Sequence, residues 1–509
     1  MKLVIDPVTR IEGHLRVVVE VAGGKVTDAW SLSTLFRGFE IFMQGRDPMS
    51  AWHMAHRVCG VCPTSHGNTS CMGLEDAFGV TAPWDAWLVR NLMESAQILH
   101  SHVLWFYTLN AFDYVDVTSA LKAKATTPTL KAVQDKLKAF VASGQLGFLK
   151  RGYWGSPLMK LPPELNLELA AHYLQALVIQ AKAAQFLAVF GGKFPYHMTT
   201  PPGGVTVVPT IEDIANAESL FREVKDFVEG TMYPDLLAIA PYYLDLAGYG
   251  RGWANFLAWG VLEDKSHDPY KRVLPRGALY DGQLTPAQKV DPRQVGEWVN
   301  HSWYTPPCGN GRNPADGLTV PDFTRYELDH HYSWIKAARV DGKPMEVGPL
   351  ARMLIAYSYG DPRAKKLVDG ALKALGHPGQ PQILLSNLGR IAARILEAVL
   401  VAQVTEEFFT ELTDRVASGK AEWYTPPKIP QSAAGVGAWE APRGALAHWN
   451  QIEDGKLSLY QFVPASNWNF APRDEKGVRG PVEEVLIGTP VANPEQPLEV
   501  LRVLHTFDP

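Results

Sequence analysis

The chain has 509 residues, of which 46% are hydrophobic and 20% are charged, so it can bury a substantial core and contains no long disordered span. A formal net charge of −5 argues against broad attraction to nucleic acid or to an anionic lipid surface. Four cysteines are too few for a disulfide framework, and the sequence shows neither a secretory signal nor an uncharged run long enough to span a bilayer.

The predicted elements begin with strands. Residues 2–32 contain an alternating apolar and polar run, and Gly23-Gly24 forms the predicted hairpin turn. Two long helices are expected over residues 85–109 and 167–190, because apolar side chains recur on one face at helical spacing. These helices are the first half of a predicted bundle core.

Two further helices complete this predicted bundle. Thr210-x-x-Asp213 has the pattern of a helix start, and Ser386 precedes the longest apolar helix, from Leu388 through Val416. The segment 240–345 between them is rich in Gly, Pro, Tyr and Trp and has weak periodicity. We therefore expect an ordered, loop-rich insertion with short strands at Arg272–Leu274 and Gly277–Tyr280.

Near the end of the sequence, Asp454-Gly455 joins the two arms of a predicted hairpin, Ala445–Ile452 and Leu457–Val463. The whole pattern predicts one domain of the α+β class, predominantly helical, with a central bundle of long helices and small peripheral sheets. The N-terminal strands would occupy residues 1–50, and the helical core residues 51–239 and 346–420. The insertion would be residues 240–345, and the C-terminal strands with a metal-site segment would be residues 421–509.

The chemistry of the chain is concentrated in Arg57-Val-Cys-Gly-Val-Cys-Pro-Thr-Ser-His66. The spacing of Cys59 and Cys62 lets one tight loop turn both sulfurs toward one point. Structural zinc, thiol–disulfide exchange and redox metals bound through thiolates all use such a pair.

The surroundings of the pair separate these three chemistries. His66 and Cys71 could complete a zinc knuckle, but knuckles are short autonomous modules, often in basic chains, and this motif is embedded in an acidic globular chain. Thioredoxin-like exchange requires a small α/β unit, which the helix-rich context disfavours. A redox metal is therefore the favoured interpretation.

The cysteine motif resembles the first cysteine signature of the nickel–iron hydrogenase large subunit. Six further segments resemble that family in the same order along nearly the whole chain: Arg10-Ile-Glu-Gly-His14, Phe36-Arg-Gly-Phe-Glu40, His301-Ser-Trp-Tyr304, Ala441-Pro-Arg-Gly444 with His448-Trp449, Trp468-Asn469, and His505-Thr-Phe-Asp-Pro509. The resemblance implies an enzyme that splits H2 heterolytically and passes the electrons on, with the uptake direction favoured.

The resemblance also implies the cofactors and partners. A nickel ion and an iron ion would be bridged by thiolates, with cyanide and carbon monoxide on the iron, and a Mg²⁺ ion would lie nearby. The partner would be a small subunit that carries iron–sulfur clusters, in a heterodimer or a dimer of heterodimers. A maturation chaperone and a C-terminal endopeptidase would act during assembly, and no nucleic acid would bind. The location would be periplasmic, or membrane-associated through the partner, with the cytoplasm as the alternative.

Individual residues carry over by resemblance to matching positions. Cys59 would be a terminal nickel ligand and Cys62 a bridging ligand, Arg443 would place its guanidinium over the metals, and Asp508 would pair with it. Glu12 would be the first carboxylate of a proton path. Glu40 would bind Mg²⁺ together with the carbonyl of Phe462. The residues His66, Ser466, Ser101 and Pro442 would surround the metals. Val61 and Leu109 would narrow the gas channel.

The sequence departs from the family in two places. His100-Ser101-His102 has serine where many relatives have a carboxylate, so Arg443 would lack one acidic neighbour. The family also continues after Asp-Pro with a second Cys-x-x-Cys and a histidine. We expect such a segment to follow Pro509 or to have been lost by truncation, and the alternative is a form unable to assemble the metal site. The alternative functions are a hydrogen sensor and a non-catalytic relative of the quinone-proximal subunit of respiratory complex I, a branch that has no use for the cysteine pair.

Overall fold

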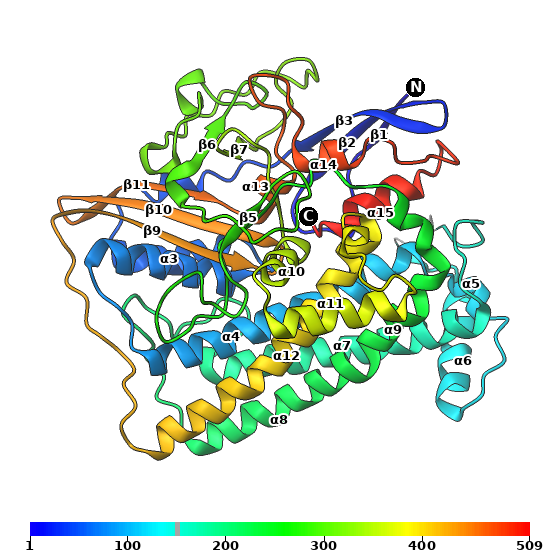
Figure 1. Ribbon diagram of the computed structural model, residues 1–509, viewed down its shortest axis with the longest axis horizontal. Coiled ribbons are helices and arrows are strands. Elements are labelled where there is room, and N and C mark those ends of the chain that lie inside the picture. Colours follow the sequence, from blue (N-terminus) through cyan, green and yellow to red (C-terminus); the bar gives the residue numbers. More distant parts are fainter. Residues whose placement is uncertain (148–152) are drawn as a thin grey trace.

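The computed structural model describes residues 1–147 and 153–509, and four long helices form its core. They are α4 (Trp84–Val103), α7 (Pro163–Gly191), α8 (Ile211–Phe227) and α12 (Asn387–Ala417). Helix α12 packs on α4 and α8, and α7 packs on the same two helices. Figure 1 shows these helices side by side below the sheets. The predicted bundle is confirmed.

The starts of these helices follow from local chemistry. The Thr210 hydroxyl accepts a hydrogen bond from the Asp213 N–H at 3.1 Å, and the Asp213 carboxylate accepts from the Thr210 N–H at 3.0 Å. The Ser386 hydroxyl accepts from the Gly389 N–H at 3.2 Å and caps α12. Both predicted helix starts are confirmed.

Helix α7 differs from the sequence-based expectation in one respect. It is long and apolar enough, by length and composition, to cross a membrane. The sequence analysis found no such run, because Glu164, Glu168 and Lys182 interrupt it. In the fold, α7 contacts α4, α5, α6 and α8, but its apolar side chains Leu174, Leu177 and Val178 are exposed.

Two antiparallel sheets of three strands lie above the bundle. The first has the order β1-β2-β3, with bounds Lys2–Ile5, Leu15–Ala22 and Lys25–Ser33. The second has the order β11-β10-β9, with bounds Lys456–Val463, Gly444–Glu453 and Ser432–Ala441. Both predicted hairpins are confirmed. The sequence analysis missed β9.

Helix α3 (Pro63–Phe78), which follows the cysteines, packs directly on β9 and β10. Glycine permits this close approach, because a Cβ atom on Gly437 would lie 2.0 Å from the Thr69 carbonyl oxygen. A Cβ atom on Gly435 would lie 2.1 Å from the Gly73 carbonyl oxygen. The start of α3, and with it the cysteine loop, is thereby fixed against the second sheet.

The insertion contains only short strands. A three-stranded sheet has the order β5-β4-β8, with bounds Gly277–Leu279, Phe256–Ala258 and Glu346–Val347, and β6 pairs with β7 at Val295–Trp298 and Ala337–Val340. The predicted strand at Gly277–Tyr280 is confirmed as β5. The predicted strand at Arg272–Leu274 is wrong: Leu274 makes one isolated bridge to Val261, because Arg272 turns inward to the carbonyl oxygens of Trp259 and Gly260.

The remaining helices are short or lie around the bundle. Their bounds are α1 (Phe39–Phe42), α2 (Ala51–Ala55), α5 (Val117–Ala120), α6 (Pro128–Ser143), α9 (Tyr233–Ile239), α10 (Pro349–Ser358), α11 (Pro362–Ala374), α13 (Ala465–Asn469), α14 (Pro481–Val485) and α15 (Leu498–Thr506).

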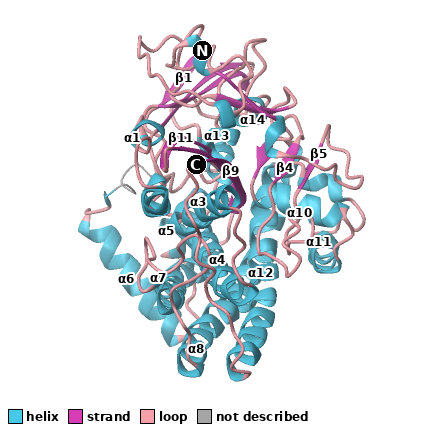
Figure 2. Ribbon diagram, turned by 90° about the vertical axis from the view of Figure 1, so that its left-hand side faces the viewer, coloured by secondary structure: helices cyan, strands magenta, loops and turns pink. Residues whose placement is uncertain are grey.

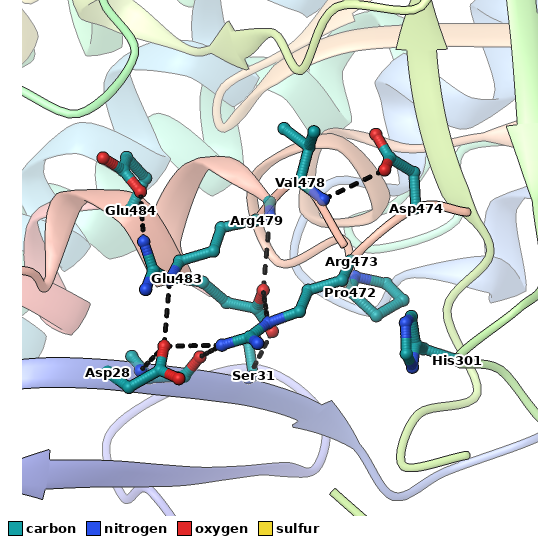
Figure 3. A network of polar contacts seen from close by, with 12 residues as sticks. Asp28, Ser31, His301, Pro472, Arg473, Asp474, Val478, Arg479, Glu483 and Glu484 are labelled. Carbon is teal, nitrogen blue, oxygen red and sulfur yellow. Dashed lines mark hydrogen bonds and ion pairs between the residues drawn. The ribbon is translucent and has the colours of Figure 1, made fainter. Parts of the chain in front are cut away.

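A network of polar contacts ties the first sheet to the C-terminal segment (Figure 3). Asp28 on β3 accepts from Arg479 Nε at 2.9 Å and also pairs with Arg473. Glu483 on α14 accepts from the Ser31 N–H at 3.0 Å. Segments more than 400 positions apart in the sequence are thus joined.

Helix α15 brings the C-terminal residues into the junction between bundle and sheets. Phe507, Asp508 and Pro509 are buried. The indole N–H of Trp105 donates to the His505 carbonyl oxygen at 2.7 Å. Figure 2 shows the N-terminal sheet at the top, the long helices below, and the C-terminus between them.

Candidate metal centre

Cys59 and Cys62 lie in the turn that joins the 3-10 helix His56–Val58 to α3. Pro63 occupies the first position of α3, where the missing N–H costs no hydrogen bond. The Cys62 N–H contacts Cys59 Sγ at 3.2 Å, and both cysteines are free thiols. One short turn therefore presents both sulfurs together, as predicted from their spacing.

The two thiols differ in proton affinity. A hydrogen bond from the Cys62 thiol, together with the positive charge of Arg443, lowers the pKa of Cys59 to about 7. The same hydrogen bond and burial raise the pKa of Cys62. The pair thus shares one proton near neutral pH, and a soft cation that displaces this proton would meet two thiolates.

Arg443 occupies the tight turn between β9 and β10. Its Nη2 donates to Asp508 Oδ1 at 2.9 Å, while Nε and Nη1 have no hydrogen-bond partner although the side chain is buried. Burial opposes the charge, but the negative charges of Asp508 and the two cysteines outweigh it and raise the pKa of Arg443. The guanidinium therefore stays protonated.

A cavity of about 530 Å³ opens between the cysteine loop, the first sheet and the β9–β10 turn. Most of the predicted site residues line it, although they come from distant parts of the chain. They are Glu12, Glu40, Cys59, Cys62, His66, Arg443, Phe462 and Ser466.

Glu12 lies next to the cysteine loop. Its Oε1 accepts a hydrogen bond from the Gly60 N–H at 3.3 Å, and its charge is close enough to oppose ionisation of the Cys59 thiol. Its backbone N–H donates to the Pro509 carbonyl oxygen at 3.0 Å. These two contacts hold Glu12 between the cysteine loop and Pro509.

Glu40 and Phe462 also lie together, although the contact is made by the N–H of Phe462 and not by the carbonyl oxygen named for the predicted Mg²⁺ site. The Phe462 N–H donates to Glu40 Oε1 at 3.4 Å, and the Thr319 hydroxyl contacts the other carboxylate oxygen. The ammonium group of Lys336 lies 3.8 Å from Glu40 Oε2. Lys336 was not predicted, and it supplies the positive charge that balances Glu40 in the protein itself.

The other predicted residues have more varied surroundings. His66 Nδ1 contacts His448 Nε2 at 3.1 Å, so this ring nitrogen faces a second histidine. Burial lowers the pKa of His66 to about 3. The buried Ser101 hydroxyl has no hydrogen-bond partner among the described residues, and the carbonyl oxygen of Pro442 accepts from Arg352 at 2.9 Å.

Val61 and Leu109 were predicted to narrow a gas channel. Their carbonyl oxygens accept hydrogen bonds from Gln97 and Arg10, respectively, and neither residue lines the cavity of the cysteines. Their part in gas access stays a prediction.

Two contacts disfavour the zinc knuckle. Cys71 Sγ donates to the Thr200 carbonyl oxygen at 2.9 Å, and the ring of His66 contacts His448. Within residues 1–147 and 153–509, no group of three or more His, Cys, Asp or Glu side chains converges as a complete metal site. The two sulfurs, the cavity and the unpartnered nitrogens of Arg443 nevertheless fit a soft metal whose anionic ligands would accept from the guanidinium.

The sequence analysis missed a ring of buried charged residues behind Arg443. Arg352 and Glu397 make two hydrogen bonds to each other, at 2.8 and 2.6 Å, and both are fully buried. A charged residue within an otherwise apolar helix, as in Leu350-Ala-Arg-Met-Leu354, was the available signal.

Comparison with known proteins gives the family. The model of the nickel-dependent hydrogenase family matches residues 37–509, and a HoxL-like model matches residues 2–31. The hydrogenase-1 large chain of Escherichia coli K12 is 40% identical over 560 aligned positions, covering 100% of this chain and 94% of that protein. The uptake hydrogenase large subunit of Rhizobium leguminosarum bv. viciae is also 40% identical, with the same shares covered.

Solved structures agree with this assignment. A NiFeSe hydrogenase variant from Desulfovibrio vulgaris Hildenborough matches with a TM-score of 0.87 and 34% identity, covering 100% of this chain and 98% of that chain. The reduced NiFeSe hydrogenase from Desulfomicrobium baculatum matches with a TM-score of 0.84 and 34% identity, covering 100% and 99%. The chain therefore belongs to the nickel-dependent hydrogenase family and is a catalytic large subunit of a nickel–iron hydrogenase.

Proposed function

We propose that this subunit oxidises H2 at a nickel–iron centre in the cavity beside Arg443, with Cys59 and Cys62 as thiolate ligands. The observation that carries the proposal is the meeting of two sulfurs, one of them with a pKa of about 7, with a buried guanidinium that has unpartnered nitrogens. When bound, the centre supplies the polarising position at which H2 is split heterolytically. Cyanide and carbon monoxide on the iron would be anionic and neutral hydrogen-bond acceptors. The unpartnered nitrogens of Arg443 and the Ser466 hydroxyl would donate to them.

The residues of the chain then provide for the proton. Cys59 Sγ lines the cavity together with Arg443 and Glu12, so we assign to this sulfur the uptake and release of the proton. Glu12, bonded to Gly60 beside this sulfur, is placed to receive it. Arg443 remains a fixed charge and a hydrogen-bond donor, because its pKa is raised above the usual value.

A Mg²⁺ ion beside Glu40 is part of the proposal. A carboxylate oxygen is the ligand type that Mg²⁺ prefers, and Glu40 lies against the backbone of Phe462. Lys336 would then turn from direct neutralisation of Glu40 to pairing with Glu297, whose Oε2 lies 3.4 Å from its nitrogen.

The partner is a small subunit, as the names of the large-chain relatives imply. We propose that this partner carries iron–sulfur clusters that accept the electrons, that it sets a periplasmic or membrane-associated location, and that a chaperone and an endopeptidase assist assembly. The uptake direction is proposed because several relatives are uptake hydrogenases by name.

The test is H2-dependent reduction of a viologen dye by the purified complex, combined with nickel, iron, zinc and selenium analysis. Selenium is included because solved neighbours are NiFeSe enzymes by name. The variant Glu12→Gln should lower kcat roughly 10²-fold with metal content unchanged, because proton transfer by a placed carboxylate contributes that much. Glu20→Gln, at a half-exposed surface ion pair, is the control. Equal rates for the two variants would remove Glu12 from the proton path, and a wild-type complex inactive with H2 would overturn the function.

A further inference from the structure

The Arg443 guanidinium is held from two sides. Its side chain donates to Asp508, and its backbone is held by a second arginine, Arg352 on α10. Arg352 Nη1 donates to the Ala441 carbonyl oxygen at 2.9 Å, and Nη2 donates to the Pro442 carbonyl oxygen at 2.9 Å. Arg352 therefore fixes the two peptide groups that precede Arg443.

The two sides are connected to each other. Asp508 Oδ2 accepts from Arg394 Nη1 at 3.3 Å, and this nitrogen lies 3.5 Å from His102 Nδ1. His102 Nε2 lies 2.9 Å from Glu397 Oε1, and Glu397 binds Arg352 through both oxygens. Six side chains, from α4, α10, α12, the β9–β10 turn and the residue Asp508 that follows α15, thus form a closed ring.

The ring determines one tautomer of His102. Nδ1 faces an arginine N–H and must accept, so Nε2 carries the hydrogen and donates to Glu397. Burial lowers the pKa of His102 to about 4, so the imidazole is neutral at physiological pH. Each charge in the ring is then opposed by a neighbour: Arg352 by Glu397 and Glu440, and Arg394 with Arg443 by Asp508.

The orientation of Arg443 has few other restraints. Among the described residues, Nε and Nη1 have no hydrogen-bond partner, and the Ser101 hydroxyl on α4 makes no hydrogen bond either. The start of α10 touches the same turn: a Cβ atom on Gly348 would lie 2.9 Å from the Arg443 carbonyl oxygen. A movement of α10 would therefore be passed directly to the turn.

We propose that Arg352 and Glu397 are positioning residues for the Arg443 guanidinium. They act on its backbone through the carbonyl groups of residues 441 and 442, and on its side chain through the members of the ring that lead to Asp508. They touch neither the cavity nor the sulfurs. The inference rests on the proposed role of Arg443 at the metal centre. It states that side chains outside this centre hold the Arg443 guanidinium in place.

The test compares Arg352→Lys with Arg90→Lys in the purified two-subunit enzyme. Arg90 is a matched control, because it is also fully buried, binds both oxygens of Glu75 and donates to the carbonyl oxygens of Pro201 and Gly204. Lysine keeps the charge at either site and loses the planar fork. The hydrogen bonds of the ring should therefore be broken in Arg352→Lys and kept in Arg90→Lys.

The first readout requires no activity. Hydrogen–deuterium exchange of the peptide spanning residues 439–446 should be roughly tenfold faster in Arg352→Lys and unchanged in Arg90→Lys. The second readout is kinetic: kcat should fall roughly tenfold in Arg352→Lys, with KM for H2 and nickel content as in the wild type. Unchanged exchange at 439–446, or an equal loss of kcat in both variants, would overturn the proposal.

A milder variant covers the case in which Arg352→Lys does not fold. His102→Gln keeps a donor toward Glu397 and removes the contact to Arg394, so it opens the ring without an unpaired charge. Exchange at 439–446 should rise in this variant as well, and unchanged exchange would contradict the ring. If the wild type shows no H2 oxidation, the function fails, while the exchange data still decide whether the ring positions the turn.

Discussion

Arg443 Nη2 donates to Asp508 Oδ1 across 2.9 Å, and this single contact joins the β9–β10 turn to the residues that follow α15. Asp508 also binds Arg394, so one buried carboxylate balances two buried guanidinium groups. Buried charges of this kind depend on their partner, because no water replaces a missing contact.

Asp508→Asn should therefore destabilise the fold strongly. The amide leaves two buried positive charges without a negative neighbour, which costs about 3–5 kcal/mol for a broken buried pair. Urea unfolding of the purified complex measures this change. Asp245→Asn, at a surface pair with Lys160, should change the unfolding free energy by less than about 1 kcal/mol. Similar midpoints for the two variants would show that Asp508 does not carry this charge balance.

The close packing of α3 on β9 gives a second prediction. Gly437→Ala places a methyl group against the Thr69 carbonyl oxygen, at 2.0 Å before relaxation, and should cost about 1–3 kcal/mol of stability. Because α3 begins at the cysteine loop, nickel retention should fall in parallel. Gly370→Ala on α11, where a Cβ atom meets nothing within 4 Å, should instead stabilise the protein by up to about 1 kcal/mol. Equal melting temperatures would refute the packing argument.

His197 gives a prediction about pH. Burial lowers its pKa from 6.5 to about 3, so the folded protein binds fewer protons at this site than the unfolded chain below pH 6.5. Its contribution to stability is complete above pH 6.5 and is lost as the pH falls toward 3. Between pH 6.5 and pH 5 this amounts to about 2 kcal/mol.

His197→Gln removes that titration. The difference in unfolding free energy between wild type and variant should therefore shrink by about 2 kcal/mol between pH 6.5 and pH 5, measured by urea unfolding at both values. His14→Gln, the same substitution at an exposed histidine, is the control. A constant difference between wild type and His197→Gln across this range would contradict the account.

Local sequence signals predicted much of the fold. Two signals each depend on residues within a few positions: the apolar spacing in α4, α7 and α12, and the cap at Thr210. Such local patterns can be recognised in the sequence alone. The strand β9 was missed because its Ala-Ala-Gly-Val-Gly segment has little alternation. Its conformation comes from pairing with β10 and from packing on α3, which only the folded chain provides.

The site divides in the same way. Cys59 and Cys62 were predictable because both lie in one short motif. The neighbours that tune the site were not, since they come from far along the chain: Lys336 reaches Glu40 from the insertion, and His448 contacts His66 across 382 positions. Their charges and tautomers depend on burial, which spacing in the sequence does not reveal.

The most direct measurement is the nickel content of the purified complex in three forms. Wild type should contain stoichiometric nickel, Cys62→Ser should lose it together with H2 oxidation, and Cys308→Ser, whose buried sulfur contacts Thr305 and Val320 outside the cavity, should keep both. Zinc in place of nickel in the wild type, or full nickel retention in Cys62→Ser, would contradict a metal centre held by the sulfurs of residues 59 and 62.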